Sequence, residues 1–137
     1  MTWDELRAQV LGDPSIDQGR GVSEAKVRAA ESLIGPLPLE FRQYLLDFGS
    51  LTKGHRRLYG LGPDVHPSMN VVRMTLLERA DAPGLPQTAV VFYNNGSGDL
   101  SFVNPSGQVQ TWLHETPADP YFEAPTFATW LSDHFGY

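Results

Sequence analysis

Residues 89–113, AVVFYNNGSGDLSFVNPSGQVQTWL, decide the class of fold. Within this stretch, three short runs are rich in apolar and β-branched side chains, which is typical of β-strands. The two links between the runs consist of Asn, Gly, Ser, Asp and Pro, which are the residues that form tight turns. We therefore predict an antiparallel meander of three strands, at residues 89–93, 100–103 and 109–113.

Outside the meander, apolar side chains recur with the helical period of 3.6 residues. Thr2, Ser23 and Thr126 stand where a side chain can cap a helix, and Pro38 suits a first turn because no N–H donor is needed there. Residues 12–21 and 117–125 are expected to be irregular. The predicted helices are Trp3–Leu11, 23–34 (apolar face Val27, Ala30, Leu33, Ile34), 38–48 (Leu37, Phe41, Leu45, Phe48), Met69–Ala80 (Met69, Val72, Leu76, Leu77) and 126–134, and a further strand is predicted at Arg57–Leu61.

The order of these elements, with helices first, then the meander and then a last helix, is typical of α+β folds. We expect a mainly antiparallel sheet flanked by helices, with the helices of residues 23–48 on one sheet face. The 137 residues fit a single domain, with an N-terminal helix and loop at 1–22 and a core at 23–137. The side chains predicted to be buried are Phe41, Leu45, Phe92, Phe102 and Trp130.

The net charge of −6 lies entirely in the second part of the chain. All ten Lys and Arg residues fall between Arg7 and Arg79, where ten acids balance them, whereas residues 80–137 contain six acids and no Lys or Arg. Such a field repels nucleic acid and attracts basic partners. Two interpretations stay open: a surface that recruits a basic protein, or acidity that serves solubility alone.

The composition excludes several classes of protein. Without cysteine, the chain forms no disulfide and no thiolate metal site. The N-terminal residues, MTWDELR, carry acids where a signal peptide carries a basic segment. No run approaches the roughly 18 apolar residues of a membrane span. We expect a soluble, cytoplasmic protein that has no membrane partner.

No pattern of catalytic residues is visible in the sequence. The four histidines lack the spacings that place two imidazoles on one metal, and there is no G-x-S-x-G elbow, phosphate-binding loop or dinucleotide fingerprint. We therefore predict no enzyme activity, no metal and no cofactor. A small metal-dependent enzyme, with a site assembled from His55, His66, His114 and the acids, is the remote alternative. His134 is expected to be half-buried at the edge of the last helix's apolar face.

Three segments resemble the SUKH superfamily, a cell-wall-assembly-regulator-like immunity protein domain. Residues 31–49, ESLIGPLPLEFRQYLLDFG, resemble its signature of a helix, an LP step, an aromatic residue and a helix ending in Gly. Residues 89–103 resemble its strand, G-x-G-D turn and strand, and residues 127–131 resemble its closing helix. The resemblance covers roughly Ser23 to Leu131 and implies an α+β domain with a mainly antiparallel sheet.

The resemblance also implies a function without catalysis. Bacterial members are similar to immunity proteins that bind and inhibit the toxin domain of a polymorphic secretion system, frequently a nuclease or a deaminase. A scaffold or regulatory protein-binding module of the same fold is the alternative. Asp99 either caps its turn or faces the partner. The residues that match the family motifs are interpreted as fold determinants: Gly35, Leu37, Pro38, Gly49, Gly98 and Asp99.

A surface that binds a basic toxin domain is expected in the acidic part of the chain, without direct contact to nucleic acid. Charged and aromatic residues lie together there, as they do in protein interfaces, although aromatics beside prolines also anchor loops to a core. The predicted partner-binding residues are the charged Glu115, Asp119 and Glu123, the aromatic anchors Tyr121 and Trp112, and, at the adjoining turn, Asn95 and Asp99.

Overall fold

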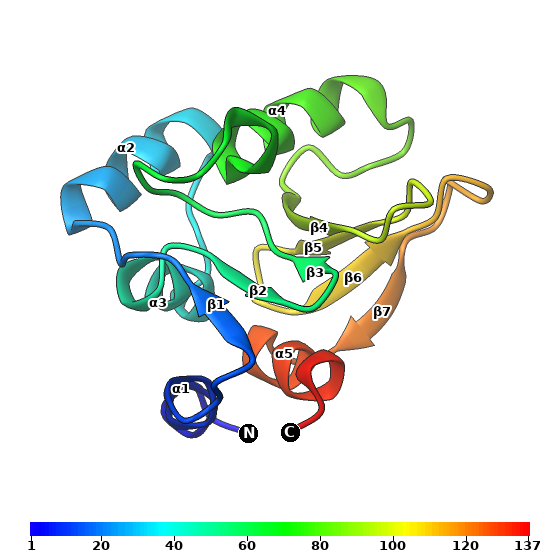
Figure 1. The fold of residues 1–137 in the computed structure, drawn as a ribbon. Helices are drawn as coiled ribbons and strands as arrows, with labels where there is room; N and C mark the ends of the chain where they lie inside the picture. Colours follow the sequence, from blue (N-terminus) through cyan, green and yellow to red (C-terminus); the bar gives the residue numbers. More distant parts are fainter.

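In a computed structural model that describes all 137 residues, the chain folds into five α-helices and seven strands in two antiparallel sheets. Helices α2 and α4 lie on one side of the larger sheet, and α5 lies on the other with α1 beside it (Figure 1). The expected α+β class is confirmed. The elements are α1 Trp3–Leu11, β1 Ile16–Gln18, α2 Glu24–Ile34, α3 Leu39–Asp47, β2 Leu51–Lys53, β3 Arg56–Arg57, the 3₁₀ turn η1 Pro67–Met69, α4 Val71–Asp81, β4 Val90–Asn94, β5 Leu100–Val103, β6 Val109–Trp112, β7 Tyr121–Ala124 and α5 Phe127–Phe135.

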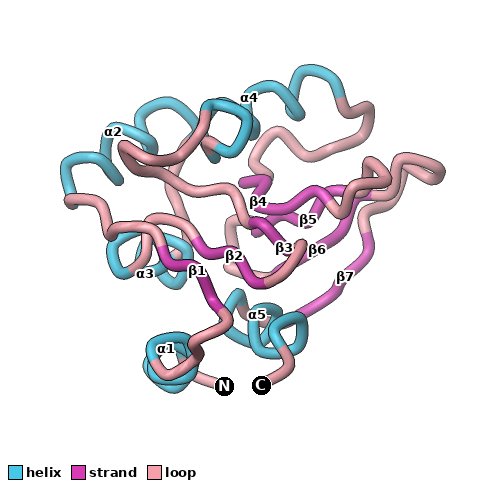
Figure 2. The backbone as a smooth tube through the Cα atoms, viewed as in Figure 1, coloured by secondary structure: helices cyan, strands magenta, loops and turns pink.

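The larger sheet has the order β4-β5-β6-β7, so each strand pairs with its neighbour along the chain (Figure 2). The predicted meander is confirmed, because Phe102 of β5 pairs with Val91 of β4 on one side and with Gln110 of β6 on the other. At the tip of the β4–β5 turn, Gly96 and Gly98 have φ angles of 90° and 101°. Residues with a Cβ atom rarely adopt such angles, so the two glycines permit this turn.

Three short strands differ from the sequence-based predictions. Residues 121–124, expected to be irregular, form β7 on β6, and residues 16–18, expected to be a loop, form β1 on β2. The strand predicted at residues 57–61 is restricted to residues 56–57, which pair with β2. The strands of residues 16–18 and 56–57 carry too few residues to show the period of 2 in the sequence. Residues 121–124 lie between Pro120 and Pro125, and prolines so close together are typical of irregular segments. The three strands form because a partner strand satisfies their backbone groups.

An aromatic cluster fills the core between the sheet and helices α3 and α5. The ring centroid of Phe127 on α5 lies 4.9 Å from that of Phe92 on β4 and 5.2 Å from that of Phe41 on α3. Trp130 stands edge-on to Phe92, at a centroid distance of 4.8 Å. The predicted burial is confirmed, since all five side chains are at most 1% exposed: Phe41, Leu45, Phe92, Phe102 and Trp130.

The apolar faces predicted for two helices are partly wrong. Leu33 of α2 is 63% exposed, and Leu76 and Leu77 of α4 are 44% and 43% exposed. Helix α4 instead turns Val71 and Thr75 inward, because the hydroxyl of Thr75 bonds the backbone of the sheet. Helix α2 lies beside α4 on one side of the larger sheet (Figure 1), whereas Phe41 of α3 packs with Phe127 of α5 against Phe92. The expectation that both helices of residues 23–48 lie on one sheet face is therefore wrong.

The two edges of the larger sheet differ in the hydrogen bonds that their backbone groups form. At β4, the hydroxyl of Thr75 on α4 accepts a hydrogen bond from the Val91 N–H at 3.1 Å and donates to the Val91 carbonyl oxygen at 3.4 Å. The Nε of Arg79, also on α4, donates to the Ala89 carbonyl oxygen at 3.1 Å. At the opposite edge, β7 pairs with β6 and with no further strand. Side chains of α4 therefore close one edge of the sheet, whereas the outer side of β7 is left unpaired.

The two ends of the chain lie close together below the sheet (Figure 1). The carboxylate of Asp13 accepts a hydrogen bond from the Tyr137 hydroxyl at 2.8 Å and pairs with Lys53 Nζ at 2.9 Å. Together with a stronger hydrogen bond from the Ser15 hydroxyl, these contacts hold the pKa of Asp13 well below its usual range. None of the five helices is both long enough and apolar enough to span a membrane.

Candidate functional site

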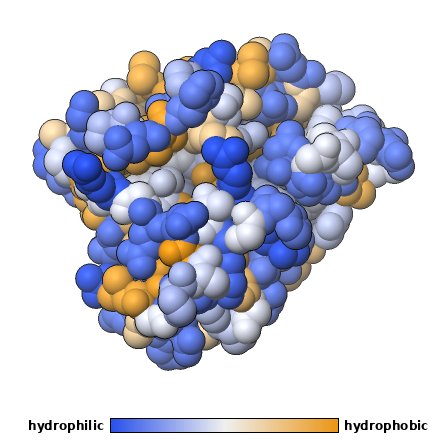
Figure 3. Space-filling model, in the orientation of Figure 1, coloured by the Kyte–Doolittle hydropathy of each residue, from blue (hydrophilic) through white to orange (hydrophobic).

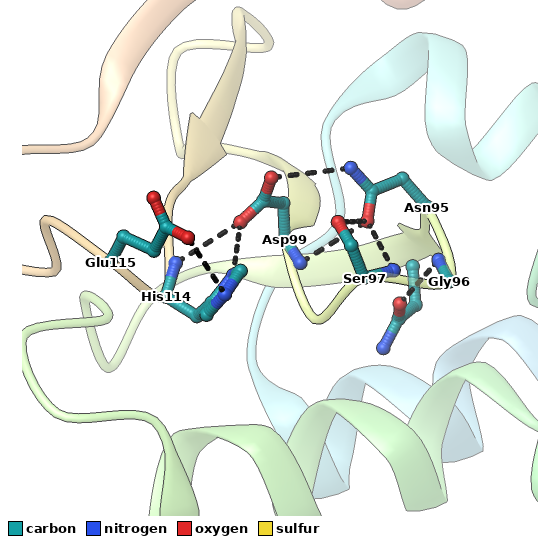
Figure 4. A network of polar contacts seen from close by, with 7 residues as sticks. Asn95, Gly96, Ser97, Asp99, His114 and Glu115 are labelled. Carbon is teal, nitrogen blue, oxygen red and sulfur yellow. Dashed lines mark hydrogen bonds and ion pairs between the residues drawn. The ribbon is translucent and has the colours of Figure 1, made fainter.

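The β4–β5 turn is held by the side chain of Asn95, one of the predicted partner-binding residues (Figure 4). Its Oδ1 accepts hydrogen bonds from the N–H of Ser97 at 2.9 Å, the hydroxyl of Ser97 at 2.8 Å and the N–H of Asp99 at 3.3 Å. Asn side chains stabilise turns in this way because they imitate a backbone acceptor. Asn95 therefore fixes the shape of the turn.

Asp99 ties this turn to the segment that follows β6 (Figure 4). Its Oδ1 accepts hydrogen bonds from the His114 N–H at 3.1 Å and from His114 Nδ1 at 2.7 Å, and its Oδ2 accepts from the Asn95 amide at 3.2 Å. These contacts, the one with the His114 ring above all, lower the pKa of Asp99. Asp99 thus joins the β4–β5 turn to the segment that follows β6, and its contact with a partner stays a prediction.

Four of the predicted residues meet around one cavity of about 170 Å³, between the larger sheet, β3 and α5. Asn95 and Asp99 reach it from the β4–β5 turn, and Tyr121 and Glu123 from β7. The remainder of the lining is contributed by Arg56, Tyr93, Ser101, Thr111, Leu113, Trp130 and His134. Most of these side chains carry a polar atom, so the cavity suits a polar ligand group.

Glu123 is not the free surface charge that the sequence predicted. Its Oε2 accepts hydrogen bonds from the Thr111 hydroxyl at 2.6 Å and from the Trp130 indole at 2.9 Å, and its Oε1 lies 3.7 Å from His134 Nε2. His134 stacks on Trp130 with its ring centroid 3.8 Å away, and it is half-buried as predicted. Glu123 thus joins β7 to α5, and a change of its charge acts on the fold as well as on the surface.

Trp112 cannot serve as the exposed aromatic anchor that was predicted. Its side chain is buried, with the whole residue 6% exposed. The indole N–H donates a hydrogen bond to the carbonyl oxygen of Pro83 at 2.9 Å. The alternating pattern of the strand does not tell which face of β6 meets solvent, and the segment after α4 covers the face that carries Trp112.

The remaining predicted residues are exposed at the end of the sheet where the β4–β5 turn and the β6–β7 segment lie side by side (Figures 1 and 2). Tyr121 is 46% exposed, and its neighbour Phe122, which sequence reasoning did not select, is 55% exposed. Glu115 is exposed and lies 3.8 Å from His114 Nε2, and Asp119 is exposed as well. Two aromatic rings and two acids thus lie on or next to the unpaired edge of β7.

No sequence signal indicated Arg56, which also lines the cavity. Its Nε is buried and has no hydrogen-bond partner within the protein, and it is the one such side-chain atom in the structure. The two carboxylates that share the cavity, those of Asp99 and Glu123, are engaged by His114 and by Trp130. Arg56 thus contributes to the lining of the cavity a side-chain nitrogen that has no acceptor within the protein.

The histidines considered for a metal site do not gather in space. His66 caps the turn η1, where its Nδ1 accepts the Ser68 N–H, and His114 bonds Asp99. No group of three or more His, Asp or Glu side chains is placed to hold a single metal ion. The geometry therefore offers hydrogen bonding, charge and exposed aromatic surface to a ligand.

Known proteins share this arrangement of the chain. The model of a family described as SUKH_5, SMI1-KNR4 cell-wall, matches residues 3–136. A crystal structure of a protein from Pseudomonas syringae pv. tomato superposes with a TM-score of 0.72 at 20% sequence identity, over 95% of this chain and 96% of that one. At this level of identity the likeness shows the fold. No curated protein matches the chain.

Proposed function

Because the chain belongs to the SUKH_5 family, we propose that it is a non-catalytic immunity protein, which binds and neutralises a cognate bacterial toxin domain in the cytoplasm. The observation that carries this proposal is the unpaired edge of β7 with its exposed Tyr121 and Phe122. Aromatic side chains exposed beside charged ones are the residues that dominate the free energy of protein association.

The edge of β7 supports a defined mode of binding. A partner segment in extended conformation can add a strand to an open sheet edge through main-chain hydrogen bonds. The β4 edge offers no such place, because Thr75 and Arg79 occupy its backbone groups. A partner that pairs with this sheet therefore has β7 as its docking strand, with Tyr121 and Phe122 as the specific contacts.

The charge near β7 supports a basic partner. Glu115 and Asp119 stand at this end of the sheet, in the part of the chain that has no Lys or Arg. A nuclease or deaminase domain presents basic residues to the phosphates of its substrate. An acidic protein that covers those residues competes with the nucleic acid, and complementary charge accelerates the encounter.

Arg56 adds selectivity to this surface. A buried donor without a partner costs about 1–3 kcal/mol, so a toxin side chain or carbonyl group that reaches the cavity and accepts its hydrogen bond removes that cost. The matched control is Arg57, which is the next residue on β3 and is exposed. Arg56→Ala is expected to speed dissociation of the complex, whereas Arg57→Ala leaves dissociation unchanged.

The experiment measures binding kinetics against the product of the adjacent upstream gene at two salt concentrations. The double variant Glu115→Lys, Asp119→Lys should slow association by about tenfold and weaken its salt dependence. The control Asp17→Lys, Asp64→Lys makes the same change of charge at two exposed acids in the neutral part of the chain. Equal association rates for the two double variants would refute the acidic docking surface.

A scaffold or regulatory role is the second candidate, and the cell-wall description of the family favours it. The same surface would then recruit a cellular protein. Protection of a host that expresses the upstream gene product separates the two roles, because only an immunity protein restores growth of the intoxicated cells.

A further inference from the structure

A second surface, on the other side of the sheet, is apolar. A groove of about 950 Å³ lies between α2, α4 and the loop of residues 61–67. Leu33 of α2 and Leu76 of α4 line it although they are 63% and 44% exposed. Orange side chains interrupt the hydrophilic surface at the top of Figure 3, over these two helices. Exposed leucines gathered in one groove mark an interaction site on a protein surface.

The lining follows the periodicity of the two helices. Lys26, Ala30 and Leu33 recur along α2, and Val72 and Leu76 recur one turn apart along α4. Each helix has 11 residues and is therefore about 16 Å long. The groove thus offers an apolar strip about three turns long, with small alanine side chains on α2. Such a groove accommodates the apolar face of a third helix.

The charges in this groove are positive and unpaired. Lys26 and Arg73 both line it and both are exposed. Two other cations of the same region have acidic partners, Arg28 at 3.7 Å from Glu24 and Arg20 at 3.8 Å from Asp64. Lys26 and Arg73 have no carboxylate within 4.0 Å, since neither forms an ion pair in the structure. A ligand for this groove needs acids beside its apolar face.

From the shape, lining and charge we infer that the groove between α2 and α4 binds an amphipathic helix of a partner protein, with acidic residues flanking its apolar stripe. The groove has no lining residue in common with the cavity beside β7. The inference is therefore independent of the proposed toxin-binding surface, and the domain can hold one partner on each side of the sheet.

The test is an NMR titration of the isotope-labelled protein with two synthetic probes. One is a helical peptide of about 14 residues, roughly 20 Å long, with a leucine stripe flanked by glutamates. The other has the same leucines flanked by lysines. The acidic probe should shift the amide signals of α2, α4 and residues 61–67, and it should bind about tenfold more tightly than the basic probe.

Substitutions in the protein test whether the probe binds in the groove. Leu33→Asp should weaken binding of the acidic probe by tenfold or more, whereas Leu39→Asp, at a 77% exposed leucine of α3 outside the groove, should leave it unchanged. Lys26→Glu together with Arg73→Glu should reverse the preference for the acidic probe. The inference is overturned by equal affinity of the protein for both probes, or by unchanged binding of the acidic probe to Leu33→Asp. It is also overturned if the amide signals shift with protein concentration alone, because the groove would then bind a second copy of this chain.

Discussion

Replacement of Thr75 by valine tests how α4 closes the β4 edge of the sheet. Valine has nearly the volume of threonine, so the substitution removes the hydroxyl group and leaves the packing in place. Thr75 and Val91 are both fully buried. Without the hydroxyl, the N–H of Val91 loses its partner at 3.1 Å, and its carbonyl oxygen loses a longer contact at 3.4 Å.

The expected loss follows from these two contacts. A buried donor left without a partner costs about 1–3 kcal/mol, and the longer contact adds little. We therefore expect Thr75→Val to lower the free energy of unfolding by about 2 kcal/mol. Thr75→Ser keeps the hydroxyl and removes one methyl group, which costs about 1 kcal/mol.

Urea unfolding followed by tryptophan fluorescence measures both variants. At an unchanged dependence on urea, a loss of about 2 kcal/mol lowers the midpoint by about 1 M. Hydrogen exchange at the Val91 amide should accelerate in Thr75→Val and not in Thr75→Ser. The reasoning is refuted if the valine variant is as stable as the wild type, or if the serine variant is the less stable of the two.

Three further predictions concern single residues. Glu123→Lys should lower the free energy of unfolding by about 2–3 kcal/mol, since it leaves the Trp130 indole without its acceptor. Glu123→Gln should lower it by less, and equal urea midpoints of the two variants would contradict this. The fold holds the pKa of the Asp13 carboxyl group below its value of about 3.8 in the unfolded chain. The ionised carboxylate therefore stabilises the fold at pH values above about 3.8, and this contribution is lost as the pH falls through the lowered pKa. The difference in unfolding free energy between the wild type and Asp13→Asn should therefore shrink from pH 5 toward pH 2, and a constant difference would count against it. Tyr121→Ala should speed release of the partner by about tenfold without a change in stability, and an unchanged dissociation rate would remove Tyr121 from the interface.

The sequence by itself determined the features that depend on neighbouring residues. Thr2, Ser23 and Thr126 cap their helices as predicted, because each hydroxyl bonds a backbone N–H three residues ahead. The glycines of the β4–β5 turn and the alternating strands around it were visible for the same reason. The resemblance of residues 31–49 to the SUKH superfamily also depends on contiguous residues, and it agrees with the family match.

The candidate site was less accessible to sequence reasoning. Asn95, Asp99, Tyr121 and Glu123 do meet around one cavity, yet their roles differ from those expected, because Asn95 and Asp99 shape a turn and Glu123 joins two elements. The charge pattern selected a group of acids. It could not show which of them are already engaged by a donor from a distant segment.

Only the tertiary structure decided what depends on pairs of residues far apart in the chain. Trp112 is buried because the segment around Pro83 covers it. Arg56 of β3 and Tyr93 of β4 line the same cavity although 37 residues separate them in the chain. Leu33 and Leu76 had the periodicity of buried residues, but they face a groove between two helices. A periodic pattern indicates which residues share a face of an element. Whether that face is covered depends on the packing of the whole chain, since burial is a property of the neighbours that the fold brings to it.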